Sequence, residues 1–141
     1  MAEIDYEAEY NNRARVPEHE EIILGWGREA ENYRADALKE GRAELGLAYG
    51  DTPRQFIDLF LPRAGAVAPL ALFVHGGYWR SLDPSMFSHV AGGLNARGVA
   101  VAVAGYDLGG NHGPAGHEGL AAHQLEDEIP TIAIDFAKKG L

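Results

Sequence analysis

The chain contains no cysteine, only three serines, and no apolar run that approaches the length of a membrane-spanning helix. The absence of cysteine excludes disulfides, thiolate catalysis and cysteine zinc sites, and it fits a reducing compartment. A spanning helix needs about 20 apolar residues, and residues 1–5 show neither the basic nor the apolar part of a secretory signal. The composition therefore predicts a cytoplasmic protein with no membrane partner.

Basic residues are scarce as well, because 12 Lys and Arg stand against 21 Asp and Glu, which gives a net charge of −9. This acidic balance argues against nucleic acid and anionic membrane surfaces as partners. The length of 141 residues fits one domain with a core of its own. We expect a single domain over residues 1–141, with a polar N-terminal arm at 1–16 and a loop rich in glycine and histidine at 108–125.

Hydrophobic periodicity predicts the first elements of this domain. Apolar residues at helical spacing follow Pro17, which suits the first position of a helix, and predict a helix that ends near Lys39. The segment 43–53 is expected to be a connection. Residues 55–61 alternate between two faces, with Ile57, Leu59 and Leu61 on one and Phe56, Asp58 and Phe60 on the other, and this pattern predicts a strand.

Two continuous apolar runs, 70–74 and 99–104, have the composition of strands that are buried on both faces of a parallel sheet. Between them, Asp83 and Pro84 suit the N-cap and the first residue of a helix that ends near Gly98. Strand, helix and strand at this spacing form a βαβ unit, so we expect the two strands to be parallel and adjacent.

The most informative feature is the sequence HGGYW, which directly follows the first of these runs. Its glycines, Gly76 and Gly77, permit backbone conformations that aim N–H groups into a cavity and let a substrate approach closely. Such a loop can stabilise the oxyanion of acyl transfer, although a plain turn is the alternative. We interpret His75 as a residue that orients the loop rather than as a general base. Tyr78 and Trp79 are candidates for the wall of a substrate pocket, with a packing role for Trp79 as the alternative.

No serine occupies the place of an activated nucleophile. Ser81, Ser85 and Ser88 flank or lie on the helix after the loop, and none sits on a tight turn from a strand into a helix. The motif G-x-S-x-G, which marks such a turn, is absent. A nucleophilic role is therefore not expected of these serines.

Three histidines gather in and just after the glycine-rich loop: His112, His117 and His123. A metal site needs a rigid frame with defined ligand spacing, and a loop with five glycines supplies neither. The arrangement G-x-G-x-x-G directly after a strand is also absent. Neither a metal nor another cofactor is therefore expected. Beyond this loop the pattern predicts a final helix over 128–140.

Three segments together resemble bacterial α/β hydrolases of the arylformamidase (kynurenine formamidase) and esterase type: EYNNRARVPEHEEIILGW, YGDTPRQFIDLFLP and HGGYWRSLDPSMF. The resemblance covers about residues 5–108. It implies part of the α/β-hydrolase fold, a three-layer αβα arrangement with a mostly parallel sheet. It also implies that the backbone N–H groups of Gly76, Gly77 and Tyr78 contribute to an oxyanion hole for a small acyl or aryl ester or formamide substrate.

The serine, aspartate and histidine of that family would all fall beyond Leu141, so the resemblance implies the N-terminal portion of a serine hydrolase, without the strands from the nucleophile elbow onward. Such a chain is expected to have little activity alone. The strand 70–74 would then present an open apolar edge to a partner chain or a second copy. The open alternatives are a subunit of a split hydrolase completed by a second chain, a non-catalytic module that binds a small ligand, and a truncated product without a function of its own.

Overall fold

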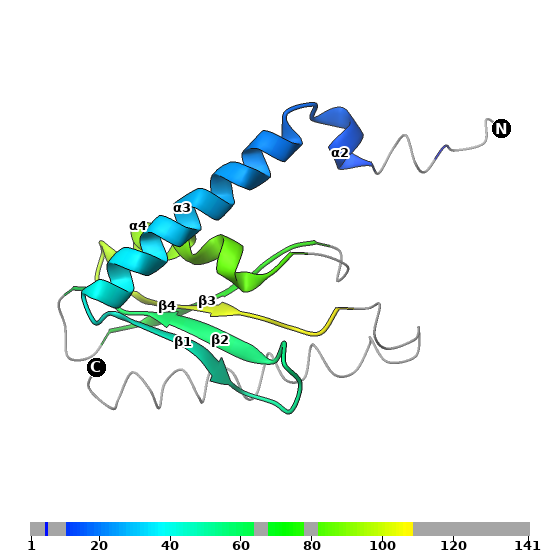
Figure 1. The fold of residues 1–141 in the computed structure, drawn as a ribbon. Helices are drawn as coiled ribbons and strands as arrows, with labels where there is room; N and C mark the ends of the chain where they lie inside the picture. Colours follow the sequence, from blue (N-terminus) through cyan, green and yellow to red (C-terminus); the bar gives the residue numbers. More distant parts are fainter. Residues whose placement is uncertain (1–4, 6–10, 64–67, 78–81, 109–141) are drawn as a thin grey trace.

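The computed structural model describes residues 5, 11–63, 68–77 and 82–108. Within these ranges, helices and strands follow one another as Figure 1 shows. In chain order the elements are α2 (Asn12–Arg15), α3 (His19–Lys39), β1 (Ala43–Ala48), β2 (Phe56–Phe60), β3 (Leu70–Val74), the 3₁₀-helix η1 (Pro84–Val90), α4 (Ala91–Asn95) and β4 (Ala100–Ala104).

The four strands form one sheet in the order β1-β2-β4-β3. β3 and β4 pair in parallel, with Leu70 opposite Ala100 and Val74 opposite Ala104. The predicted βαβ unit is thus confirmed, with η1 and α4 as its crossover. β2 pairs antiparallel with both β1 and β4, so the described sheet is mixed and its parallel part is the β3–β4 pair.

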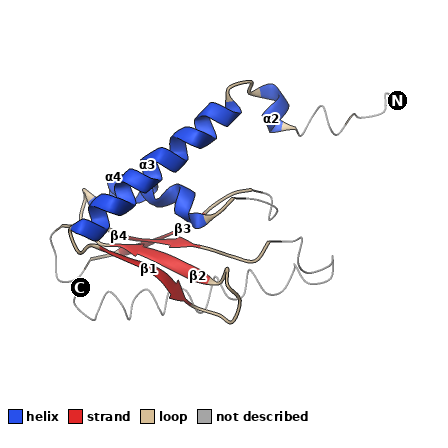
Figure 2. Ribbon diagram, viewed as in Figure 1, coloured by secondary structure: helices blue, strands red, loops and turns tan. Residues whose placement is uncertain are grey.

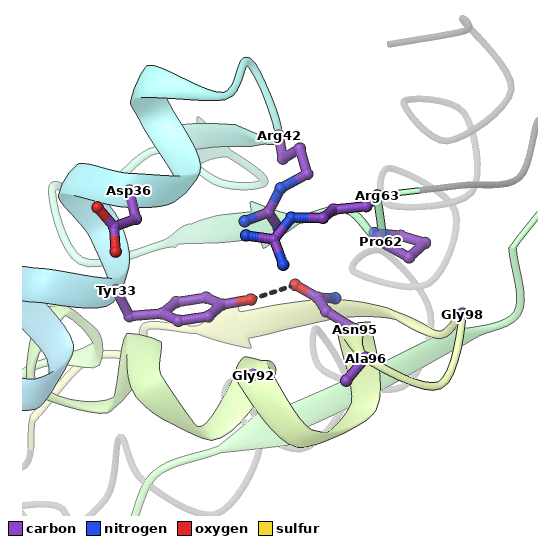
Figure 3. A pocket seen from close by; sticks show the side chains of 9 residues that line it. All are labelled: Tyr33, Asp36, Arg42, Pro62, Arg63, Gly92, Asn95, Ala96 and Gly98. Atoms are coloured by element: carbon purple, nitrogen blue, oxygen red, sulfur yellow. Dashed lines mark hydrogen bonds between the residues drawn. The ribbon is translucent and has the colours of Figure 1, made fainter.

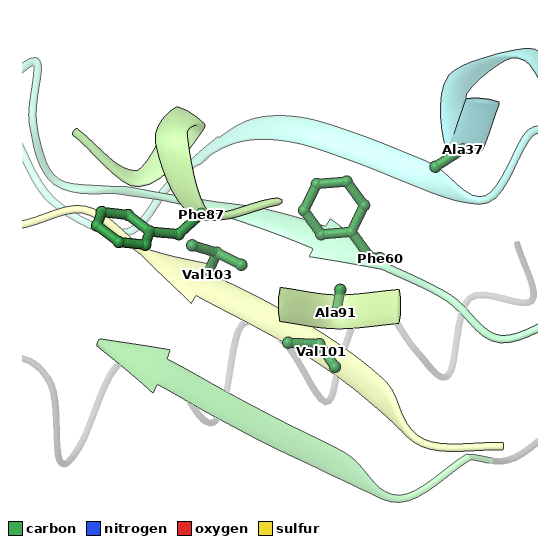
Figure 4. Close-up of a cluster of buried hydrophobic side chains, with 6 residues drawn as sticks. All are labelled: Ala37, Phe60, Phe87, Ala91, Val101 and Val103. Atoms are coloured by element: carbon green, nitrogen blue, oxygen red, sulfur yellow. The ribbon is translucent and has the colours of Figure 1, made fainter. Parts of the chain in front are cut away.

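The helices α3, η1 and α4 lie on one face of the sheet (Figure 2), and α2 lies beyond the outer end of α3. The buried cluster on this face, drawn in Figure 4, consists of Ala37, Phe60, Phe87, Ala91, Val101 and Val103. On the other face, Ile57 and Leu59 of β2 pack with Ala102 and Ala104 of β4. The alternation predicted for β2 is therefore confirmed, since its successive side chains enter two different clusters.

The expected connection over 43–53 is wrong in its first half, where β1 pairs with β2. The register shifts between Glu44 and Leu47, which marks a β-bulge, and Gly46 within it has a φ of +70°. A bulge adds a residue and breaks the alternation of side chains along a strand. The apolar period that would have predicted β1 is interrupted for this reason.

The expectation that both apolar runs are buried on both faces holds for β4 and is wrong for β3. All five residues of β4 are buried, because β4 lies between β2 and β3. Leu72 and Val74 of β3 are 39% and 43% exposed. Among the described strands β3 has β4 as its one neighbour, and its position at the edge explains this exposure.

The helix boundaries depart slightly from the prediction. α3 begins at His19, so Pro17 lies in the turn before the helix rather than at its first position. The N-terminal arm contains the short helix α2, which is capped by the Asn11 side chain as it accepts the Ala14 N–H at 3.0 Å. At the other end, α3 stops at Lys39 as predicted.

The helix after the loop begins as predicted. Asp83 is its N-cap, and the carboxylate accepts the Ser85 N–H at 3.0 Å, with Pro84 as the first residue. The first part of the predicted helix is the 3₁₀-helix η1, and α4 continues it. The final helix expected over 128–140, and all of the 108–125 loop after Leu108, lie outside the described residues.

A buried ionic contact fixes α3 to the sheet. The Asp58 carboxylate on β2, which is 1% exposed, accepts a hydrogen bond of 2.6 Å from Arg34 Nη1. The same nitrogen donates to Ser88 Oγ on η1 at 2.8 Å, and the other carboxylate oxygen accepts the Gly46 N–H in the bulge at 2.9 Å. One buried charge thus connects α3, η1 and β1, and these partners compensate its loss of hydration. No helix in the described ranges is long and apolar enough to cross a membrane.

Candidate active-site loop

The segment HGG leaves β3 at the carboxyl end of the strand, and Tyr106 follows β4 at the same edge of the sheet. In open α/β sheets, ligands bind in the crevice outside the carboxyl ends of parallel strands. The turn between β1 and β2 reaches the same end of the molecule (Figure 1). Three segments that are distant in the sequence therefore meet where a ligand is expected.

His75 is buried between two aromatic rings. Its ring stacks on Phe87 at a centroid distance of 5.4 Å and on Tyr106 at 4.5 Å. Its Nδ1 lies 2.8 Å from the Gly76 carbonyl oxygen, so the proton on Nδ1 is donated to the backbone of the loop. The Tyr106 hydroxyl donates to the His75 carbonyl oxygen at 2.7 Å. Side chain and backbone of His75 are thus both held in place.

Burial lowers the pKa of His75, because the charged imidazolium loses its hydration. The bond to the Gly76 carbonyl acts in the opposite direction, and the nearby Arg54 charge lowers the pKa further. With the proton on Nδ1, the neutral ring leaves Nε2 as an acceptor, and this buried atom has no hydrogen-bond partner within the described part of the chain. Burial also raises the pKa of Tyr106, which keeps its hydroxyl a donor.

The backbone on either side of the loop has positive φ angles, which residues other than glycine rarely adopt. Gly77 has a φ of +127°, a value that side chains with a Cβ rarely adopt. Gly76 is less constrained, because a Cβ there would meet no atom within 4 Å. The described chain resumes at Leu82, whose φ of +78° is unusual for a residue other than glycine. Tyr78, Trp79 and Ser81 lie outside the described residues.

Residues of the β1–β2 turn support this edge of the sheet, and the sequence analysis assigned none of them a role. Tyr49 donates its hydroxyl to the Gly105 carbonyl oxygen at 2.6 Å, and Thr52 Oγ1 donates to Asp107 Oδ1 at 2.7 Å. Arg54, from the same turn, donates to the carbonyl oxygens of Tyr106 and Leu82. The sequence feature that could have indicated them is the segment YGDTPRQF. Its polar residues, between β1 and β2, fit neither a helical nor a strand periodicity.

Ser88 is fully buried. Its Oγ accepts the hydrogen bond from Arg34 and donates to the Ser85 carbonyl oxygen at 3.3 Å. This position gives it a structural role in η1. The described residues contain no group of three or more His, Asp or Glu that could hold a metal ion, and the histidines His112, His117 and His123 lie outside them.

A hollow of about 530 Å³ lies at the opposite end of the sheet (Figure 3). Arg42 and Arg63 line it, and both donate to the Glu40 carboxylate, whose pKa falls to about 2 as a result. Tyr33 donates its hydroxyl to Asn95 Oδ1 across the hollow. Its cations are thus already paired, and it lies near the start of β4 rather than at the HGG segment.

The chain is similar to known hydrolases, although no protein-family model matches it. The kynurenine formamidase of Drosophila melanogaster is 44% identical over 71 residues, which are 50% of this chain and 23% of the relative. That of Salmo salar is 30% identical over 110 residues, 72% of this chain and 36% of the relative. A solved structure from Silicibacter sp., described as a thioesterase, superposes with a TM-score of 0.69 at 38% identity, over 75% of this chain and 39% of that one.

The matched part thus spans less than two fifths of the length of each of these relatives. The mixed, open sheet and its superposition on the Silicibacter structure define an α/β-hydrolase-like fold. Within that class, the similarities indicate the arylformamidase and esterase type for the part of the fold that the chain spans. The α/β-hydrolase-like fold class and the family resemblance predicted from the sequence are both confirmed, whereas the described sheet is mixed rather than mostly parallel, since two of its three strand pairings are antiparallel.

Proposed function

We propose that this chain is the oxyanion-loop portion of a serine-type hydrolase that acts on small esters or N-formyl arylamides. The observation that carries the proposal is the position of the HGG segment, which leaves β3 at the carboxyl end of the strand and whose first residue, His75, is buried and hydrogen-bonded. The similarity to kynurenine formamidases and to a structure described as a thioesterase supports chemistry at an ester or formamide carbonyl.

In the proposed reaction, a serine Oγ attacks the carbonyl carbon, and the carbonyl oxygen becomes an oxyanion. The intermediate collapses by breaking the C–O or C–N bond, and the leaving alcohol or arylamine takes up the proton that the serine gave away. Water then attacks the acyl or formyl serine, which releases the acid and restores the hydroxyl. The serine comes from outside this sequence, because Ser88 is fully buried in a structural role and no serine lies on a G-x-S-x-G elbow.

The residues of the loop have distinct roles in this proposal. The backbone N–H groups of Gly76, Gly77 and Tyr78 donate to the oxyanion, and each well-placed donor of this kind lowers a barrier by about 3 kcal/mol. His75 orients the loop through its bond to the Gly76 carbonyl. Tyr78 and Trp79 line the space for the acyl or aryl group of the substrate.

Phenylphosphonate tests the proposal, because it joins an aryl ring to a tetrahedral anion like that of the intermediate. Isothermal titration calorimetry would compare the wild-type chain with Gly77→Ala, in which the added Cβ opposes the φ of +127°. Gly41→Ala is the matched control, since Gly41 also has a positive φ, of +67°, its Cβ would meet no atom within 4 Å, and it follows α3 outside the loop.

We expect equal, saturable binding by the wild type and by Gly41→Ala, and a dissociation constant about tenfold weaker for Gly77→Ala, a loss of about 1.4 kcal/mol. Circular dichroism would establish that all three chains are folded. The proposal is wrong if the wild type shows no saturable binding, or if Gly77→Ala binds as tightly as the wild type.

A further inference from the structure

We propose that Arg54 is a positioning residue of the candidate site, which fixes both ends of the oxyanion loop at once. The inference rests on the function proposed above. Arg54 lies between β1 and β2, before the first residue of β2. It neither belongs to the loop nor neighbours it in the sequence, since Leu82 is 28 positions away and Tyr106 is 52 positions away.

The guanidinium of Arg54 holds the point where the loop ends. Its Nη2 donates to the Leu82 carbonyl oxygen at 2.9 Å, and its Nη1 lies 3.6 Å from Asp83 Oδ2. Leu82 has the left-handed φ of +78°, which a leucine keeps only where its surroundings impose it. Asp83 is the N-cap of η1. Arg54 therefore acts on the turn that joins the loop to its helix.

The same side chain acts on the point where the loop begins, through Tyr106. Arg54 Nε donates to the Tyr106 carbonyl oxygen at 3.0 Å. The Tyr106 hydroxyl donates to the His75 carbonyl oxygen, and its ring stacks on the His75 ring. Tyr106 thus connects Arg54 with the first residue of HGGYW. One guanidinium couples the start of the loop to its end.

This role depends on the shape of the guanidinium as well as on its charge. Nε and Nη2 point in fixed directions toward two carbonyl groups on different segments. The ammonium of lysine carries the same charge but lacks the planar fork that reaches both carbonyls in fixed directions. A lysine at position 54 would therefore preserve the local charge and lose the connection between the two ends.

The variants Arg54→Lys and Arg54→Met test this role, with Arg97→Lys as the matched control. Arg97 is exposed and donates to the Gly93 carbonyl oxygen within its own helical segment. Two quantities are measured on the full chain: the dissociation constant for phenylphosphonate by calorimetry, and the exchange rates of backbone amides by NMR. The informative amide is that of Ser85, which the Asp83 cap protects, and the amides of β2 and β4 report the sheet as a whole.

We expect both Arg54 variants to bind phenylphosphonate about tenfold more weakly than the wild type, or weaker, with faster exchange at Ser85 and unchanged exchange in the sheet. Arg97→Lys should match the wild type in both measurements. The proposal is overturned if Arg54→Lys binds and exchanges like the wild type, because charge alone then suffices. It is also overturned if the sheet amides accelerate as much as Ser85, because Arg54 then serves only general stability.

The two proposals fail in different ways. If the wild-type chain does not bind phenylphosphonate at all, the proposed function is wrong. The exchange rates at Ser85 still decide whether Arg54 holds the loop, because they require no ligand. If the wild type binds and only the Arg54 variants show no defect, the function stands and the positioning role is refuted.

Discussion

His75 is held as a neutral ring by its position between Phe87 and Tyr106, and this burial has a consequence for pH dependence. Burial lowers its pKa in the folded chain below the usual value of 6.5. The unfolded chain therefore binds a proton more readily, and the free energy of unfolding falls as the pH drops below about 6.5. Above that pH this contribution is complete and constant.

We expect the ring resonances of His75 to titrate below pH 6.5 in an NMR experiment, because the folded site disfavours the charged form. The variant His75→Phe keeps an aromatic ring in the stack but has no group to titrate. Its urea midpoint should change less than that of the wild type when the pH is lowered through the same range. An equal change in both chains would show that other groups produce the pH dependence.

Asp58 anchors α3 to the sheet through its contact with Arg34. The variant Asp58→Asn removes the negative charge that pairs with Arg34, while the side chain at position 58 keeps its size and shape. We expect a loss of about 2–3 kcal/mol in the free energy of unfolding, because a hydrogen-bonded pair with one buried member is broken. Urea denaturation measures it. Glu40→Gln is the control, since its ion pairs with Arg42 and Arg63 lie at the surface. A smaller effect in Asp58→Asn than in Glu40→Gln would contradict this account.

At the scale of elements, the end of β4 is packed too closely for any side chain at position 105. A Cβ on Gly105 would lie 2.5 Å from the Arg54 carbonyl oxygen, and its neighbours there are largely backbone atoms. We expect Gly105→Ala to lower the free energy of unfolding by about 1–3 kcal/mol, as overpacking does in protein cores. Thermal or urea denaturation would show it.

Gly25 in α3 is the matched control for that substitution. A Cβ there would meet no atom within 4 Å, and the residue lies inside a helix of 21 residues. Gly25→Ala should therefore raise the free energy of unfolding by about 0.5–1 kcal/mol, because alanine loses less backbone entropy in a helix. The packing described for β4 would be incorrect if both alanine variants were equally stable.

The bulge of β1 is a second place where an element depends on one glycine. Gly46 has a φ of +70°, yet a Cβ there would meet no atom within 4 Å. The cost of Gly46→Ala is therefore conformational, and we expect about 1–2 kcal/mol from urea denaturation. Gly46→Asn should cost less, since asparagine tolerates the left-handed region better. Equal costs would mean that the backbone leaves this region in the variants.

At the scale of the whole molecule, local patterns predicted most of the described fold. The apolar runs of β3 and β4, the Asp83 cap and the alternation of β2 each depend on neighbouring residues, and all three are present in the structure. The strand β1 was not predicted, because the bulge around Gly46 interrupts the alternation of its side chains. The apolar run of β3 alone predicts burial on both faces; its place at the edge of the described sheet followed instead from the family resemblance, which implied an open edge at 70–74.

The candidate site was predictable only in part, for a related reason. The HGGYW segment carries its own signal in five consecutive residues. Arg54 lies in the polar segment YGDTPRQF, but neither Arg54 nor Tyr106 indicates its partner locally, because their contacts with Leu82 and His75 join positions that are about 30 residues apart. The sequence could therefore indicate the loop, whereas the groups that hold it became visible only in three dimensions.

The central claim is that the loop from His75 to Tyr78 stabilises an oxyanion at the carboxyl end of β3. The most direct test is a ¹H–¹⁵N NMR titration of the wild-type chain with phenylphosphonate. The account predicts that the largest saturable shifts occur at the amides of Gly76, Gly77 and Tyr78. Shifts that gather instead at Arg42 and Arg63, around the hollow at the other end of the sheet, would contradict it.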